Sequence, residues 1–188
     1  MNTFFTSDHH FQHSNVVRYS NRPFRNVDEM DEEFVKRWNE VVKPTDVVYH
    51  LGDFTLGNLE IADEFLKRLN GSIYIMEGSH DRWLKPFSIK NMNPTPHVNF
   101  LPPLYSLNGM INSDNGYNLP IVLCHYSLRS WDRSHYGSWH LFGHHHGNLE
   151  SYGMSFDVGV DCWDYYPVSF EQVREKMSTL KPIMNYSK

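Results

Sequence analysis

The sequence predicts an α/β fold in which two mixed β-sheets pack as a sandwich and are flanked by helices. In the first half of the chain, short apolar runs alternate with segments of helical periodicity, which is typical of a parallel sheet with helical crossovers. In the second half, two apolar runs flank a turn-rich segment, which is typical of an antiparallel hairpin. No repeat or linker divides the sequence, and we therefore expect a single domain over residues 1–188.

In the first half we expect three strands separated by two helices. The strands are rich in residues that favour extended backbone, each ends in polar residues, and they occupy 2–8, 46–53 and 72–81. The first helix should begin after an N-cap at Asn26 and end before Pro44. The second should begin near Leu59 and end at Gly71. The order β-α-β-α-β predicts parallel strands.

In the second half the pattern changes to closely spaced strands. The hairpin strands and two further strand candidates occupy 104–111, 118–125, 139–144 and 155–163. Ser169 and Gln172 have the spacing of a capping box, so a last helix should begin there and extend to about Leu180. Two facing sheets covered by helices accommodate both halves.

Composition excludes several classes of protein. The net charge of −5 and the pI near 6.2 show that the protein as a whole is acidic, so strong non-specific binding to nucleic acid is not expected. Cys124 and Cys162 have no paired spacing, which favours a reducing compartment without disulfides. The start of the chain lacks a signal-peptide pattern, and no apolar run approaches ~18 residues. We expect a cytoplasmic protein without a membrane partner.

Candidate metal ligands follow several of the predicted strands. The segments are SDHH, LGD, GSHD, LCH and FGHHHG, and they contribute Asp8, His10, Asp53, His80, His125, His144 and His146. Because ligands of open α/β sheets bind at the carboxyl ends of strands, these scattered residues should converge. In extended backbone, residues i and i+2 project to the same side. We therefore expect Asp8 with His10, and His144 with His146, to face one crevice, with His9 and His145 pointing away.

Carboxylates combined with imidazoles, without cysteine, suit first-row divalent metals such as manganese, iron, nickel or zinc. A set of six such residues could hold two ions if one carboxylate bridges them. Two ions ~3.5 to 4 Å apart polarise a phosphoryl group and turn a bound water into a nucleophile. This local positive charge would allow an acidic protein to bind an anionic substrate.

The ordered motifs Asp-x-His, Gly-Asp, Gly-x-His-Asp, a strand ending in His, and Gly-His-x-His resemble those of the calcineurin-like metallophosphoesterases. They extend from Asp8 to His146 and so span most of the chain. Any one of these motifs is weak evidence for the resemblance, whereas all of them in this order are specific to the family. The short length and the segments RPF at 22–24, HLGDF at 50–54 and YYPVSF at 165–170 are similar to small bacterial and phage members.

The resemblance implies a role for each candidate. Asp8, His10 and His146 would hold one ion, and His125 with His144 the other. Asp53 would bridge both ions together with a hydroxide that attacks phosphorus in line. His80 would face the leaving-group oxygen as a general acid or charge stabiliser, and Asp81 would either orient His80 or cap a helix. The resemblance also implies a four-layer fold of two mixed sheets between helices.

One position departs from the family pattern. Ser79 stands where the family usually has an Asn that ligates the second ion. We expect a weaker second site, because a hydroxyl is shorter and a poorer metal ligand. Ser79 also keeps an alternative open, in which the chain is a binding or scaffold protein with a degraded second site. The presence of His80 argues against that alternative, since a scaffold has no chemical need for it.

The predicted activity is hydrolysis of a phosphate ester with two divalent ions, of which manganese is favoured. A diester is preferred over a monoester, because His80 can protonate a poor leaving group. Arg22 and Arg129 are candidate phosphate contacts. Trp131 and Trp139 could stack on a nucleotide base, but packing against the sheet is the better expectation for both.

Overall fold

The computed structural model describes residues 1–84, 97–113 and 115–183. Its first sheet has the strand order β4-β3-β2-β1-β9. The strands are β1 (Thr3–Thr6), β2 (Val47–His50), β3 (Ser72–Ile75), β4 (Val98–Phe100) and β9 (Val168–Ser169). Strands β1 to β4 are parallel, and β9 is antiparallel to β1. The predicted parallel order is confirmed, whereas the short strand β4 was not predicted.

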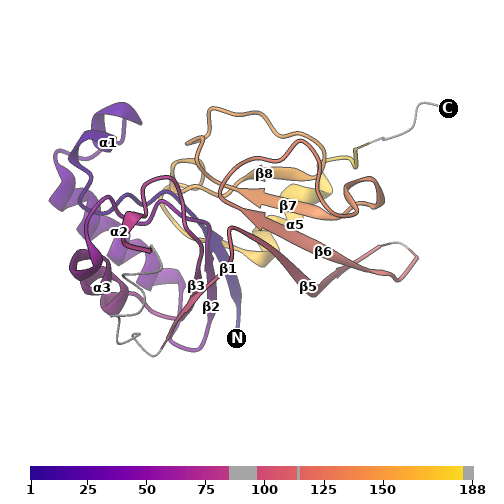
Figure 1. Cartoon of the computed structure of the whole chain (residues 1–188), viewed down its shortest axis with the longest axis horizontal. Helices are drawn as coiled ribbons and strands as arrows, with labels where there is room; N and C mark the ends of the chain where they lie inside the picture. The colour runs from indigo at the N-terminus through magenta and orange to yellow at the C-terminus, as the bar shows by residue number, and fades with distance from the viewer. Residues whose placement is uncertain (85–96, 114, 184–188) are drawn as a thin grey trace.

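Three helices pack on one face of this sheet, as Figure 1 shows. They are α1 (Ser14–Tyr19), α2 (Val27–Val41) and α3 (Leu59–Arg68). The side chain of Asn26 accepts a hydrogen bond from the backbone N–H of Glu29, which confirms the predicted N-cap of α2. Because strand residues alternate, Phe4 faces this helical layer and the fully buried Phe5 faces the second sheet.

The second sheet has the order β5-β6-β7-β8. Its strands are β5 (Leu104–Asn112), β6 (Asn118–Cys124), β7 (Trp139–Phe142) and β8 (Ser155–Asp157). The hairpin of β5 and β6 is antiparallel, as predicted, and the other pairs are parallel. Helix α5 (Phe170–Ser178) begins with the predicted capping box, and its Val173 and Met177 are buried in the core between the sheets.

The chain therefore has an α/β fold with two mixed sheets packed as a sandwich and flanked by helices, as predicted. Within the described residues, the outer face of the second sheet is covered by the segment 126–138. Trp131 of this segment is buried against His140 of β7, and Trp139 is buried as well, so both tryptophans are core residues. No helix among all the residues that the structure describes has the length and apolarity needed to cross a membrane.

The ends of the strands from both sheets meet along one edge. The backbone N–H of Asp8 donates to the carbonyl oxygen of Gly52, which joins the loops after β1 and β2. The N–H of Gly143 donates to the carbonyl oxygen of His125, which joins the loops after β6 and β7. Val160, after β8, donates to the carbonyl oxygen of Ser7 and so connects the two sheets at this edge. The predicted ligand segments therefore lie side by side.

Candidate metal centre

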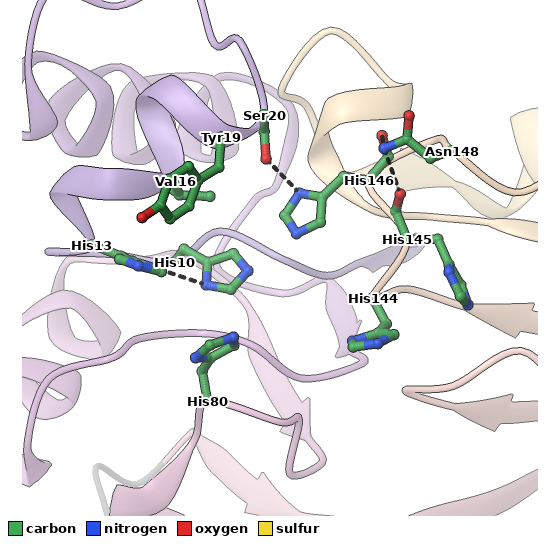
Figure 2. A pocket seen from close by; sticks show the side chains of 10 residues that line it. All are labelled: His10, His13, Val16, Tyr19, Ser20, His80, His144, His145, His146 and Asn148. Atoms are coloured by element: carbon green, nitrogen blue, oxygen red, sulfur yellow. Dashed lines mark hydrogen bonds between the residues drawn. The ribbon is translucent and has the colours of Figure 1, made fainter.

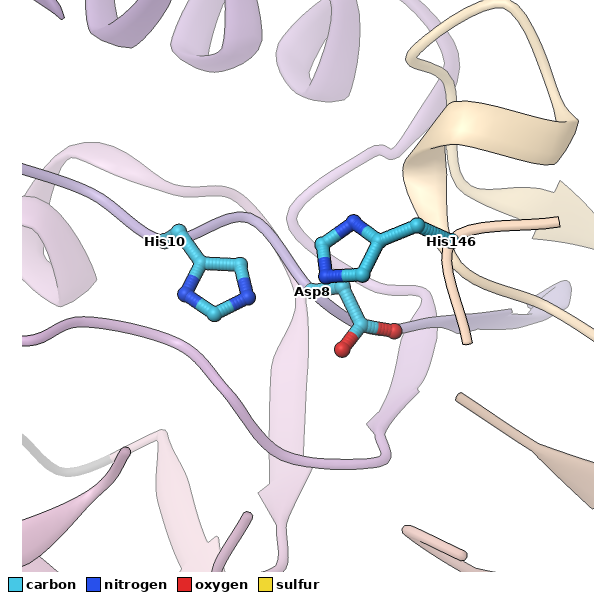
Figure 3. Close-up of side chains that lie close together, drawn as sticks. All are labelled: Asp8, His10 and His146. Carbon is cyan, nitrogen blue, oxygen red and sulfur yellow. The ribbon is translucent and has the colours of Figure 1, made fainter. Parts of the chain in front are cut away.

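The predicted ligands converge at this edge. Each of three groups offers ligand atoms that lie within 4.8 Å of one another: Asp8, His10 and His146; Asp53, His125 and His144; and His10, Asp53 and His80. We call the first group the first ion site and the second group the second ion site. Figure 3 shows the three side chains of the first ion site, with the imidazole of His146 next to Asp8 and the His10 ring stacked 5.2 Å from the His146 ring, measured between centroids.

The backbone at these residues is not extended, and this part of the prediction was wrong. The φ angles are 61° at Asp8, 55° at His10, 54° at Asp53, 71° at His144 and 49° at His146. These values lie in the left-handed region, which Asp and His adopt more readily than most residues. The reason is the tight loops after the strands, which must turn each ligand into the site within one or two residues.

His9 points away from the site, as expected. Its imidazole packs among Phe11, Phe34 and Trp38 beneath the helices, and its Nδ1 lies 3.0 Å from Nε2 of His50. The neighbouring ligands Asp8 and His10 are turned in the opposite direction. The side chains of Asp8, His9 and His10 thus point in alternating directions, although the φ angles of Asp8 and His10 are left-handed.

Asp53 lies between the two ion sites. Its Oδ2 is 3.6 Å from Nε2 of His10 and 3.5 Å from Nε2 of His125. These separations are too long for good hydrogen bonds. They match two ligands of one ion, because metal–ligand bonds of about 2.0 to 2.2 Å place neighbouring ligand atoms ~3 to 3.5 Å apart. Asp53 is therefore placed to share an ion with each histidine.

The free imidazole nitrogens fit a metal. Nε2 of His10 and Nε2 of His125 are both buried without a hydrogen-bond partner. The Nδ1–H of His125 donates to the carbonyl oxygen of Leu51 at 2.9 Å, which leaves the lone pair on Nε2. Buried polar atoms of this kind are costly unless something binds them. A divalent cation beside each of these nitrogens would bind it together with the Asp53 carboxylate.

The carboxylates are strongly perturbed by their surroundings. Burial raises the pKa of Asp53, but the charges of His125 and His10 and the hydrogen bond from the backbone N–H of His80 outweigh burial and hold the pKa well below its ordinary value. Burial raises the pKa of Asp8 to about 7, although the charges of His125 and His146 act in the opposite direction. Asp8 also accepts a hydrogen bond from the backbone N–H of His144.

Two glycines allow the loops to approach this closely. A Cβ at Gly78 would overlap the backbone nitrogen of Asp53. A Cβ at Gly143 would overlap the side chains of Ser7 and Asp8. The glycines of the Gly-x-His-Asp and Gly-His-x-His motifs therefore have a steric role, since any larger residue would push a ligand loop away from its neighbour.

An open cavity of about 480 Å³ adjoins the ion sites. Figure 2 shows its lining, which consists of His10, His13, Val16, Tyr19, Ser20, His80, His144, His145, His146 and Asn148. The His80 ring lies 5.1 Å from the His10 ring, measured between centroids, and the backbone N–H of His80 donates to Oδ1 of Asp53. His80 is therefore held beside the Asp53 carboxylate with its imidazole in the cavity.

Ser79 contacts the Asp53 carboxylate. Its hydroxyl donates to Asp53, with Oγ 3.0 Å from Oδ2. The hydroxyl therefore supports the Asp53 carboxylate.

Among the described residues, the Asp81 carboxylate makes no hydrogen bond to the His80 ring and none to the backbone N–H groups of the short helix Arg82–Leu84 that follows it. Its buried carboxylate accepts hydrogen bonds from the backbone N–H groups of Gly78, Phe54 and Thr55 and from the indole N–H of Trp83. These bonds tie the loop after β2 to the loop after β3. The prediction for Asp81 was wrong because a sequence does not show which donors surround a carboxylate. Its role is to fix the two loops that carry Asp53 and His80.

Of the two predicted phosphate contacts, Arg22 is not available to a phosphate, whereas the role of Arg129 stays a prediction. Arg22 is buried, and all five of its N–H donors are used, by the Asp161 carboxylate, the carbonyl oxygens of Asp8 and His9, and the sulfur of Met30. It therefore has no donor left for a phosphate. Arg129 is exposed and stacks on the Tyr152 ring, 4.3 Å from its centroid, and it does not line the cavity.

Asp161 contacts a histidine of the first ion site and was not among the residues predicted from the sequence. Its Oδ2 lies 2.7 Å from Nδ1 of His146. Burial would raise the pKa of Asp161, but hydrogen bonds from His146 and Arg22 lower it to about 2. Asp161 follows the apolar run of β8, and this is the same signal that identified the other candidates.

Comparisons with known proteins agree with this fold without naming an activity. The chain is 33% identical over 179 residues to the uncharacterized protein MJ1445 of Methanocaldococcus jannaschii, and the match covers 90% of this chain and 88% of that protein. The crystal structure of AQ665, a protein of unknown function from Aquifex aeolicus, has a similar fold, with a TM-score of 0.63 at 22% identity. That match covers 93% of this chain and 98% of the other. No family model matches the chain.

Proposed function

We propose that this chain, which belongs to the same family as MJ1445 of Methanocaldococcus jannaschii, is a metal-dependent phosphoesterase that acts on phosphodiesters with two divalent ions. The observation that carries this proposal is the position of Asp53 Oδ2 between the unpartnered Nε2 atoms of His10 and His125. A single carboxylate shared by two groups of imidazole ligands suits a pair of ions, and the absence of cysteine ligands favours manganese, with iron, nickel or zinc as alternatives.

Each residue of the proposed centre has a separate task. Asp8, His10 and His146 would hold one ion, His125 and His144 the other, and Asp53 would contact both. When bound, the ions would neutralise charge on the phosphoryl group and lower the pKa of a water molecule. The Ser79 hydroxyl and the backbone N–H of His80 hold the Asp53 carboxylate in place for this task.

The proposal assigns proton donation to His80. Its ring lies in the cavity and is placed to meet a substrate bound at the ions. The alkoxide leaving group of an unactivated diester is poor and gains from protonation by His80. A diester is therefore the preferred substrate class. The cavity of about 480 Å³ is within the usual range for small-molecule sites, and the exposed ring of Tyr19 on its rim could stack on a nucleotide base.

The test is hydrolysis of bis(p-nitrophenyl) phosphate and of p-nitrophenyl phosphate by metal-free protein to which manganese is added. We expect manganese-dependent hydrolysis with preference for the diester. The variant Asp53→Asn should lose at least ~100-fold in rate, the scale of removing one electrostatic group from a catalytic site. Manganese binding without hydrolysis of either ester would instead favour a binding or scaffold protein. A cytoplasmic location remains a prediction from the sequence.

A further inference from the structure

The histidines of the two ion sites are held in different ways. In the second ion site, His125 donates to a backbone carbonyl, that of Leu51. The His144 imidazole contacts the rings of His125, Tyr126 and His145, and no carboxylate binds it within the described residues. In the first ion site, His146 has a carboxylate partner, because its Nδ1 lies 2.7 Å from Oδ2 of Asp161.

Asp161 is itself held rigidly. Arg22 donates to it through two parallel hydrogen bonds, from Nε to Oδ1 and from Nη2 to Oδ2, each 2.8 Å long. Bidentate pairs of this kind fix orientation as well as charge. The same guanidinium donates to the carbonyl oxygens of Asp8, at 2.6 Å, and His9, at 2.9 Å. Arg22 therefore links the loop that carries Asp8 and His10 to the carboxylate behind His146.

The arrangement determines which nitrogen of His146 is free. A carboxylate can only accept, so the proton of the neutral imidazole lies on Nδ1 and the lone pair on Nε2. The hydroxyl of Ser20, 3.2 Å from the same Nδ1, adds a second polar contact on this side of the ring. The opposite side of the ring lies next to Asp8 and His10 (Figure 3).

We propose that Asp161, fixed by Arg22, is a positioning residue that directs Nε2 of His146 at the first ion and makes the first ion site the tighter of the two. The proposal rests on the proposed function in one respect, namely that the centre holds divalent ions. A carboxylate behind a metal-binding histidine makes the ring a stronger ligand, and loss of such a partner typically costs about 10- to 100-fold in metal affinity. The protein would then bind one ion at low manganese concentration and become active when the second site fills.

The test is calorimetric titration of manganese into the metal-free chain of residues 1–188. Wild type should show two binding steps of unequal affinity. In Asp161→Asn the tighter step should weaken by roughly 10- to 100-fold, while the weaker step changes little. Asp164→Asn is the matched control, because the Asp164 side chain is 84% exposed and pairs with Arg37 on the surface. The control should bind manganese as wild type does.

A second measurement separates positioning from a general structural role. Nitrogen-15 NMR of the metal-free protein should show His146 protonated at Nδ1 in wild type and as a mixture of the two tautomers in Asp161→Asn. Arg22→Lys should weaken the same binding step, because Arg22 holds both the Asp161 carboxylate and the loop that carries Asp8 and His10. If Asp161→Asn does not fold, Asp161→Glu, which keeps the charge but displaces the carboxylate, takes its place.

The outcomes distinguish this proposal from the proposed function. If wild type binds no manganese, the proposed function fails, and an unchanged tautomer in the variant would overturn the positioning role as well. If wild type binds two ions and hydrolyses the diester while Asp161→Asn retains the tight step and the tautomer, only the positioning proposal is overturned.

Discussion

Oδ2 of Asp53 lies 3.5 Å from Nε2 of His125, and the two atoms face each other in a buried space without a hydrogen bond. The other ring nitrogen of His125 is already occupied by the Leu51 carbonyl oxygen. Oδ2 of Asp53 and the lone pair on Nε2 of His125 are therefore both free to bind a metal ion placed between them.

Replacing His80 should separate catalysis from metal binding. We expect His80→Gln to lower kcat for an aryl phosphodiester by about 10²- to 10⁴-fold, the usual contribution of a general acid. Manganese content, measured by elemental analysis after dialysis, should remain that of wild type. Loss of an ion in this variant would show that His80 is a ligand, as the group formed with His10 and Asp53 also allows.

Gly143→Ala should disrupt the first ion site through steric overlap with Ser7 and Asp8. The expected result is weaker manganese binding in calorimetric titration together with a lower melting temperature. Gly116→Ala is a suitable control, because its φ of 79° strains any L-residue while the added Cβ meets no atom within 4 Å. The control should lose stability, by ~1 kcal/mol, and keep its manganese affinity. Equal metal binding in both variants would contradict the steric argument.

Ser79→Asn should strengthen the second ion site. An amide oxygen reaches further than the hydroxyl, which now only donates to Asp53. We expect the weaker of the two manganese-binding steps to tighten by roughly tenfold, equivalent to about 1.4 kcal/mol. Ser79→Ala should leave that step nearly unchanged. A fall in affinity for Ser79→Ala as large as the gain expected for Ser79→Asn would mean that the hydroxyl is itself a ligand.

Stability should fall in acid through a buried histidine remote from the ion sites. Burial lowers the pKa of His140 to about 4 from 6.5, although a hydrogen bond to the Val122 carbonyl oxygen acts in the opposite direction. Between these two values the unfolded chain binds more protons than the folded protein. The free energy of unfolding therefore decreases as the pH falls from 6.5 towards 4, by up to about 1.4 kcal/mol per unit of pKa difference.

The matched variants for this prediction are His140→Gln and His135→Gln. His135 is exposed on the surface. Urea titrations of metal-free protein at several pH values should give a shallower loss of stability for His140→Gln than for wild type, and an unchanged loss for His135→Gln. The same slope in all three proteins would rule out His140 as the source.

The positions of the ligands could be predicted because they follow from strand order. Parallel strands end at one edge of a sheet, so Asp8, Asp53 and His80 had to be neighbours once the β-α-β-α-β pattern was recognised. The local conformation could not be predicted in the same way. Left-handed φ values at Asp8 and His144 arise from contacts between loops, and these contacts are absent from any single segment of sequence.

The contacts of buried charged side chains could not be predicted from the sequence either. Arg22 lies in a loop rich in polar residues, and nothing nearby in sequence indicates that Asp161, 139 positions away, accepts two of its hydrogen bonds. Asp81 was misassigned for the same reason, since its donors lie on a loop that begins after a different strand. Residue types and strand ends predict which ligands meet. Which polar groups support them depends on side-chain packing in three dimensions.

The most direct test of the metal centre is a crystal structure of the chain grown with excess manganese, with anomalous scattering recorded at a wavelength where manganese contributes. The account predicts two peaks, one bound by Asp8, His10 and His146 and the other by His125 and His144, with the Asp53 carboxylate in contact with both. A map without a peak at this edge, or with Asp53 turned away from the ions, would contradict it.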